Sequence, residues 1–206
     1  MPTRKREIEI SLTDFVDFVC KAGSAKLTQV KKLKNREAYS PATDFYKGLR
    51  EGLIENHQAD GDKSGLKNIW DSVTDEKKKK NYAEAIEGYK KFWGRKAVKW
   101  FKPPYKHWIV GDLDVRINPE LGLDYDGKYY VVKLYFKKDK LSKDKIDQIL
   151  TLMESQLRKH VEDEIRMAIL DVKNSKLFIK NDDDLSLLPL LDGEARSLEA
   201  IWKGIK

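Results

Sequence analysis

The spacing of apolar residues changes near the middle of the chain, and this change limits the possible folds more than any other feature. Up to about residue 95, apolar residues recur every three or four positions, as on one face of a helix. Beyond the Pro103-Pro104 pair they alternate in short runs that are typical of strands. We therefore predict an α+β fold. Its helical N-terminal half, about residues 10–95, packs on a small, mostly antiparallel sheet.

Local signals place the helices of the first half. Three ranges are predicted to be helical: 11–36, a helix that begins at Ser40-Pro41, and 64–93. Gly23-Ser24 is expected to divide the first range into two helices. Thr74 is expected to cap a second segment of the last range, and Gly94 is expected to end it.

The second half is predicted to hold the sheet. Its predicted strands are 108–117, 129–136, 167–172 and 177–179, with a crossing helix after Ser142 and a closing helix at 194–205. Residues 173–176 form the turn of a predicted hairpin. We predict a helical subdomain at residues 1–95 and an α/β subdomain at residues 96–206, joined in one compact unit.

Composition narrows the environment and the partners. The 206 residues include 41 lysines and arginines against 34 acids, giving a net charge of +7, which is compatible with a nucleic-acid partner. No apolar run approaches the roughly twenty residues of a membrane span, so we expect no membrane association. The single Cys20 cannot form an intramolecular disulfide, and no cysteine–histidine cluster predicts a zinc site. These features favour a cytoplasmic protein without a resident metal or cofactor.

The element order of residues 95–180 resembles the core of the PD-(D/E)XK nuclease superfamily. In that superfamily a helix precedes a β-meander, and a second helix crosses to a further strand. The resemblance implies a restriction-endonuclease-like fold, an acid on or near the second strand, and an acid-x-Lys motif on the third. Lys133 matches the lysine, but Val131 stands where the motif has its acid. Asp114 is the favoured candidate for the upstream acid, because it alternates with Asp112 on the polar face of its strand. Glu120 is the weaker candidate: it follows Pro119, as in the proline–acid pair of the family, but lies in a predicted turn.

The missing acid bears on the chemistry that the resemblance implies. Family members use their acids to hold Mg²⁺ or Mn²⁺, which activates water, while the lysine positions the attacking group. A site that lacks one carboxylate holds such a cation poorly. For Lys133 we favour a solvated lysine on a strand face, paired with Asp114 across the sheet. Asp171-Val172-Lys173 also reads acid-x-Lys, but its place at a hairpin end favours turn chemistry.

The stretch YKKFWGRKAVKWFKPPYKHW, residues 89–108, interleaves basic and aromatic side chains. Cations for phosphates and rings for bases are typical of a single-strand binding surface. The candidate nucleic-acid contacts are Lys96, Lys99, Trp100, Lys102 and Lys106. The alternative, which we favour, is that the aromatics are core residues and the lysines point outward.

The remaining reactive side chains predict no further site. We expect His57, His107 and His160 to lie in loops or at the surface, and Cys20 to be a buried structural thiol. Three hypotheses follow. The first is a catalytically degenerate, nuclease-like protein that binds DNA or RNA. The second is a protein-interaction or structural module, and the third is an active metal-dependent nuclease that uses Asp114, Glu120 and Lys133.

Overall fold

The computed structural model describes residues 7–36, 44–137, 139 and 141–205. Within them the helices are α1 (Leu12–Val19), α2 (Ser24–Lys34), α3 (Lys47–Gln58), α4 (Leu66–Asp71), α5 (Glu76–Trp93), α6 (Lys143–Leu157), the short 3₁₀ helix η1 (Arg158–His160) and α7 (Leu188–Gly204). The strands are β1 (Ile8–Ser11), β2 (Lys99–Phe101), β3 (Lys106–Val110), β4 (Leu113–Ile117), β5 (Leu121–Tyr125), β6 (Lys128–Tyr135), β7 (Arg166–Asp171) and β8 (Lys176–Ile179). The predicted α+β class is confirmed.

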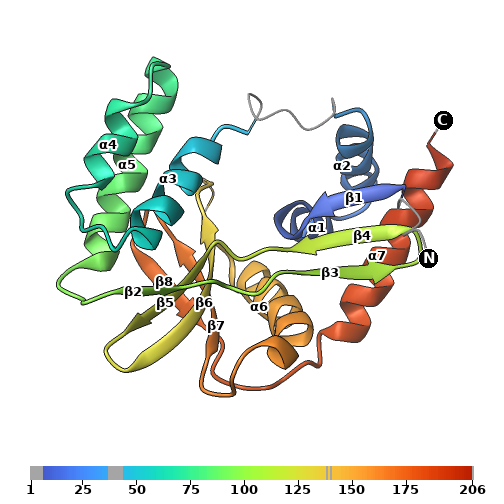
Figure 1. The fold of residues 1–206 in the computed structure, drawn as a ribbon. Helices are drawn as coiled ribbons and strands as arrows, with labels where there is room; N and C mark the ends of the chain where they lie inside the picture. The colour runs from blue at the N-terminus through green and yellow to red at the C-terminus, as the bar shows by residue number, and fades with distance from the viewer. Residues whose placement is uncertain (1–6, 37–43, 138, 140, 206) are drawn as a thin grey trace, which may run out of the picture.

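The strands form two mixed sheets instead of the single sheet that we expected. The larger has the order β2-β5-β6-β7-β8, and the smaller has the order β1-β4-β3. β6 and β7 run parallel because α6 crosses between them, and β1 runs parallel to β4. The other neighbours are antiparallel, including the predicted hairpin of β7 and β8. Figure 1 shows β4 leaving the small sheet toward β5 in the large one.

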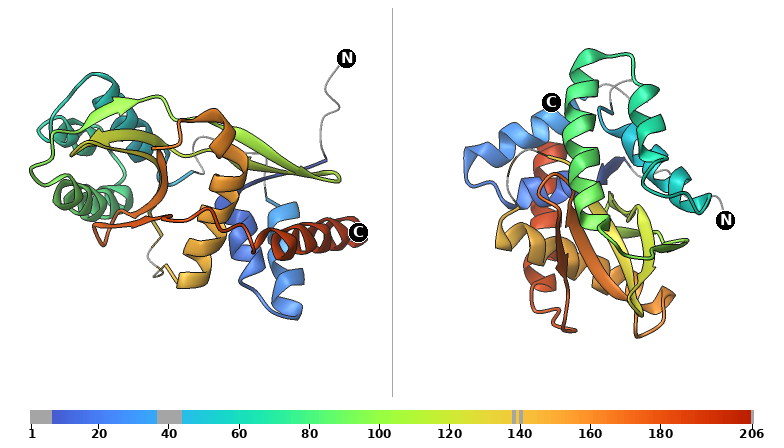
Figure 2. Two further views of the ribbon diagram at one scale, coloured as in Figure 1. Left: turned by 90° about the horizontal axis from the view of Figure 1, so that it is seen from below. Right: turned by 90° about the vertical axis from the view of Figure 1, so that its left-hand side faces the viewer.

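Alternation along β6 places its side chains in two different cores. Val131 and Tyr135 face a first core made with β1, α1, α2, α6, α7 and the small sheet. Tyr130, Val132 and Leu134 face a second core made with α3, α4 and α5. The period of two along a strand requires this division, because successive side chains point to opposite faces. Figures 1 and 2 show the two groups of helices on opposite sides of the large sheet.

Both cores draw on both halves of the sequence. Residues 8–33 join the first core together with 110–198, and residues 49–93 join the second together with 121–172. The N-terminal half is therefore not one helical layer, since α1 and α2 lie across the sheet from α3–α5. The division into residues 1–95 and 96–206 stays a prediction.

Several predicted boundaries need correction. The expected strand at 108–117 is a hairpin of β3 and β4, because Gly111 takes a positive φ of 59° and turns the chain. β1 was not predicted, since four residues carry too little pattern. Asp75, not Thr74, caps α5 by accepting a hydrogen bond from Lys78 N at 2.7 Å. Cys20, expected to be buried, ends α1 and is exposed.

Two further helix predictions concern starting points. The predicted start at Ser40-Pro41 lies outside the described residues, and α3 begins at Lys47. The closing helix α7 starts six residues before the predicted range, at Leu188, with a proline in its first turn. Among the described residues, no helix is both long enough and apolar enough to cross a membrane.

Gly88 lets α5 approach the end of β7, which predicts a strong effect of substitution. A Cβ at Gly88 would lie 2.1 Å from the carbonyl oxygen of Val172. We expect Gly88→Ala to destabilise the fold by about 1–3 kcal/mol, because backbone must move to relieve the overlap. Gly193→Ala in α7 is the matched control. Its Cβ would meet nothing within 4 Å, so helix propensity should stabilise that variant by about 0.5–1 kcal/mol. Urea unfolding of both variants measures the contrast, and equal midpoints would contradict it.

Candidate functional site

Glu120 and Lys133 form a buried ion pair where β5 and β6 meet. Glu120 immediately precedes β5, and its backbone N–H bonds to the Val132 carbonyl across the hairpin. This register puts the two side chains next to each other, with Lys133 Nζ 2.6 Å from Glu120 Oε1. The other carboxylate oxygen accepts from Leu134 N at 2.7 Å, and Lys133 Nζ also donates to the Asn118 carbonyl at 2.9 Å. Backbone groups of Asn118 and Leu134 therefore hold the two partners of the ion pair in place.

The expectation of a solvated Lys133 paired with Asp114 is wrong. Lys133 is 7% exposed, and its partner is Glu120, which is 8% exposed. Asp114 lies on β4 of the small sheet, where its Oδ1 is 2.6 Å from His107 Nδ1. The two residues are separated because β4 and β6 belong to different sheets.

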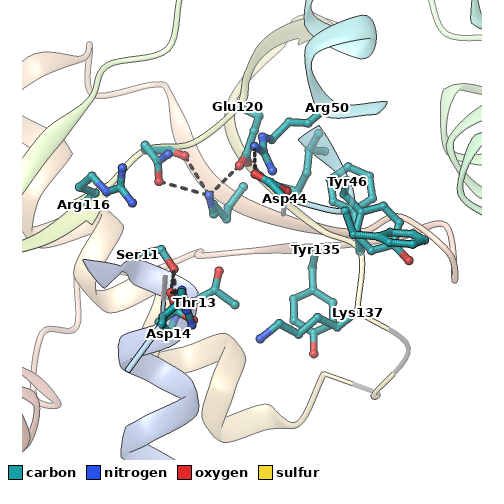
Figure 3. A pocket seen from close by; sticks show the side chains of 16 residues that line it. Ser11, Thr13, Asp14, Asp44, Tyr46, Arg50, Arg116, Glu120, Tyr135 and Lys137 are labelled. Atoms are coloured by element: carbon teal, nitrogen blue, oxygen red, sulfur yellow. Dashed lines mark hydrogen bonds and ion pairs between the residues drawn. The ribbon is translucent and has the colours of Figure 1, made fainter. Parts of the chain in front are cut away.

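The Glu120–Lys133 pair lines a pocket of about 810 Å³. The lining comes from the β1–α1 junction, the start of α3, the β4–β5 connection and the end of β6. Its residues are Ser11, Thr13, Asp14, Arg36, Asp44, Phe45, Tyr46, Arg50, Arg116, Asn118, Glu120, Lys133, Leu134, Tyr135, Phe136 and Lys137. Figure 3 shows Arg116 at one end and Tyr46 at the other, with Glu120 between them. We call this space the Lys133 pocket.

The Lys133 pocket carries more positive than negative charge. Its lining contains five lysines and arginines against three carboxylates. Asp14 binds Arg36 through two contacts of 3.0 and 3.1 Å, and Asp44 lies 2.7 Å from Arg50. Burial by itself would raise the pKa of Asp14, but the hydrogen bonds and charge of Arg36 hold that pKa below its usual value. Each of the three carboxylates is paired with a lysine or arginine, and the surplus charge is cationic.

Two buried donor atoms in the same lining have no hydrogen-bond partner among the described residues. They are the Tyr135 hydroxyl, on a side chain that is 4% exposed, and Arg116 Nε. Arg116 Nε has only a 3.4 Å ion pair with Glu9. Buried polar groups without partners cost free energy, so they are rare in folded proteins. Neither atom is accessible to solvent, so a ligand in the pocket would reach them only after neighbouring side chains move.

The donor set near Lys133 does not fit a metal ion. Val131 is fully buried in the first core and does not line the Lys133 pocket, so no carboxylate takes the place of the second family acid. Within the described ranges, no group of three or more acidic, histidine or cysteine side chains could hold a cation. Glu120 is instead committed to Lys133 and to Leu134 N.

The basic aromatic stretch contributes its rings to the cores. Trp100 packs against the second core, whereas Phe101 and Trp108 pack against the first. Tyr105 is the exception, at 57% exposed. Trp100 therefore offers little ring surface for stacking, as the alternative interpretation predicted.

The five lysine and tryptophan candidates differ in their exposure. Lys99, Lys102 and Lys106 are exposed on or beside β2 and β3. Lys96 donates to the Phe92 carbonyl, and its Nζ lies 4.8 Å from the centre of the Phe92 ring. A role in nucleic-acid binding for Lys96, Lys99, Trp100, Lys102 and Lys106 stays a prediction.

The second acid-x-Lys sequence is turn chemistry, as predicted. Asp171 accepts hydrogen bonds from Asn174 N and Nδ2 at 3.3 and 2.9 Å and so fixes the β7–β8 turn. Lys173 reaches α5, where it pairs with Glu84 at 2.7 Å. Both side chains are therefore accounted for without catalysis.

The expectation of surface or loop histidines is wrong for His57. It lies in α3, is 3% exposed, and its Nε2 is 2.6 Å from the Tyr89 hydroxyl. Burial lowers the pKa of His57 to about 4. His107 lies on β3 beside Asp114, and His160 is exposed in η1.

Sequence reasoning missed most of the pocket wall. Arg36, Arg50, Arg116 and Tyr135 come from four separate elements, and no local motif connects them. The only available signal was Pro119-Glu120, which did point to the acid that contacts Lys133. Comparisons with known protein families and with curated proteins find no match for this chain.

Proposed function

We propose that this chain is a nuclease-like protein that binds nucleic acid without hydrolysing it. In this proposal the Lys133 pocket receives a phosphate of the nucleic-acid backbone. The observation that carries the proposal is the surplus positive charge of the lining, with five lysines and arginines against three carboxylates around the buried Lys133. Phosphate oxygens are strong acceptors and carry the matching charge.

The arrangement of the core supports the nuclease-like part. β5 and β6 form a hairpin, α6 crosses over, and β7 returns parallel to β6. This order, with the lysine on β6 next to an acid that follows proline, is what the resemblance to PD-(D/E)XK nucleases implies. The Glu120–Lys133 contact at 2.6 Å adds a geometric likeness to the likeness in element order.

We propose that the protein does not hydrolyse nucleic acid, because the side chains that line the pocket do not suit a metal ion. Metal-dependent cleavage needs carboxylates that can converge on a cation. In the Lys133 pocket the described carboxylates each face a lysine or arginine, and position 131 is an apolar core residue. Binding through cations then remains as the activity that this lining can support.

Exposed lysines outside the pocket would favour a polymer over a small anion. Lys106 lies opposite Ile117 on β4, one residue after Arg116 of the pocket wall, and its side chain points to the opposite face of the small sheet. Lys102 and Lys99 follow on the chain segment that leads back to β2. Cations spaced along a surface can contact successive phosphates, which a single small ligand would not need.

Charge removal at the pocket mouth tests the proposal. We expect Arg116→Gln with Lys137→Gln to weaken binding of a fluorescent oligonucleotide about tenfold or more, and to reduce the slope of log K against log salt by about 1–2. Anisotropy titrations at about 50 and 200 mM salt measure this, with Mn²⁺ present so that cleavage is detected. Single-stranded and duplex DNA and RNA serve as ligands.

The matched control is Lys143→Gln with Lys203→Gln, which removes the same charge from α6 and α7 outside the pocket. Equal weakening in both double variants would mean that net charge, and not the Lys133 pocket, drives binding. No binding at low salt would favour the protein-interaction module. Mn²⁺-dependent cleavage would favour the active nuclease. A third variant with Lys99, Lys102 and Lys106 changed to glutamine tests the β2–β3 lysines separately.

A further inference from the structure

Tyr105, His107 and Asp114 form a hydrogen-bonded chain on the β3–β4 hairpin. His107 and Asp114 are diagonal neighbours across the two strands, and His107 Nδ1 is 2.6 Å from Asp114 Oδ1. The Tyr105 hydroxyl contacts the other ring nitrogen, Nε2. Tyr105 and His107 share one side of the chain because they are two residues apart. The hydrogen-bonded series of Tyr105, His107 and Asp114 is separate from the Lys133 pocket, since none of the three residues lines that pocket.

The direction of the hydrogen bonds follows from the chemistry of the groups. A carboxylate oxygen of Asp114 is the acceptor in this contact, which assigns Nδ1 of His107 as the donor. In a neutral imidazole, Nε2 is then free to accept the Tyr105 O–H proton. A hydroxyl on a base that is itself oriented by a carboxylate is the arrangement of an activated nucleophile.

The surroundings of Tyr105 leave room for a substrate. Tyr105 is 57% exposed and borders a groove of about 470 Å³ between the β2–β3 connection and the segment after α6. Pro103 and Pro104, which also line the groove, restrict the backbone just before the tyrosine. Lys102 lines the same groove, and Lys106 is exposed on the other side of Tyr105. A phosphoryl group in the groove could contact Lys102, and Glu162 also lines this space.

We propose that Tyr105 is a nucleophile toward phosphodiesters. The phenolic oxygen attacks phosphorus and forms a Tyr–O–P bond, while the P–O bond to the leaving alcohol or phenol breaks. His107 Nε2 takes the hydroxyl proton, and the leaving oxygen departs with the bonding electron pair. One phosphodiester is exchanged for another, so the step needs no oxidant, reductant or metal. Asp114 acts as a positioning residue, because it touches His107 and not the substrate.

An activated phosphodiester, thymidine 5′-(4-nitrophenyl phosphate), tests the proposal with the full chain. Nitrophenolate is a good leaving group, so attack alone should release it. We expect a burst of one nitrophenolate per chain and a thymidylyl group on Tyr105, found by mass spectrometry of the peptides. Tyr105→Phe should abolish both. Tyr129→Phe, which alters another exposed tyrosine, should leave both unchanged.

Variants of the other two residues separate activation from structure. His107→Gln is expected to slow the burst about 100-fold or more, the usual effect of losing a general base. His107→Ala should recover part of the rate when free imidazole is added, which a structural defect would not allow. Asp114→Asn should slow the burst, and Asp114→Glu should restore part of it. A missing burst, or one that survives Tyr105→Phe, would overturn the proposal whatever the oligonucleotide titrations show at the Lys133 pocket.

Discussion

Replacing Lys133 with methionine is expected to destabilise the protein by about 3–5 kcal/mol at neutral pH. The change would leave the Glu120 carboxylate buried with Leu134 N as its remaining hydrogen-bond donor. A buried charge without a counter-ion loses far more free energy than a surface charge does, because water cannot solvate it. Urea unfolding followed by tryptophan fluorescence measures the loss, since five tryptophans report on the fold.

A second variant tests the cause of this loss. Adding Glu120→Gln to Lys133→Met removes the charge and keeps an acceptor for Leu134 N, so most of the stability should return. Lys143→Met provides a surface comparison, because its partner Asp147 is on an exposed face of α6, and a much smaller loss is expected there. A loss in Lys133→Met no larger than in Lys143→Met would show that the pair is solvated.

Acid is expected to destabilise the protein through His57. The pKa of His57 falls from 6.5 to about 4 on folding, because burial disfavours the imidazolium. A depressed pKa means that the unfolded chain binds the proton first. The contribution of the neutral His57 to the free energy of unfolding is therefore fully present above pH 6.5, declines as the pH falls toward 4, and is absent below that. The difference between the two pKa values corresponds to about 3 kcal/mol of unfolding free energy in total, of which about 2 kcal/mol is lost by pH 5.

A glutamine at position 57 isolates this effect. His57→Gln keeps a polar partner for the Tyr89 hydroxyl but cannot titrate in this range. The free energy of unfolding should therefore fall less steeply between pH 7 and pH 4.5 than in the wild type. His160→Gln, at an exposed position, is the matched control and should keep the wild-type slope. Identical slopes for all three proteins would show that His57 is not buried as a neutral imidazole.

The sequence predicted which residues form helices and strands better than it predicted which of these elements pack together. The alternation of Tyr129–Phe136 correctly indicated β6, because period two is a local property of a strand. The same alternation continued through Gly111 and hid the turn between β3 and β4. A glycine at positive φ reverses the chain without interrupting the pattern of the flanking residues.

The candidate site was predictable only where residues are close in sequence. Glu120 and Lys133 belong to one hairpin, so their meeting depends on its register, which the Asp126-Gly127 turn helps to fix. Lys133 was nevertheless expected in solvent, because no pattern indicated that α1 and α3 bring side chains beside it. Arg36 and Arg50 reach the same space through tertiary packing, which depends on contacts between distant segments.

The parallel pairing of β1 with β4 has a consequence for biosynthesis. Ile8 finds its partner Leu113 only after the whole segment between them has been translated. The wall formed by Ser11, Thr13 and Asp14 therefore cannot close around Lys133 early on the ribosome. Contacts between such distant segments form slowly, because a long loop must first be ordered. The second core also joins distant segments, residues 49–93 with 121–172. The Lys133 pocket is thus a late product of folding, and a ligand bound there would select chains that have completed it.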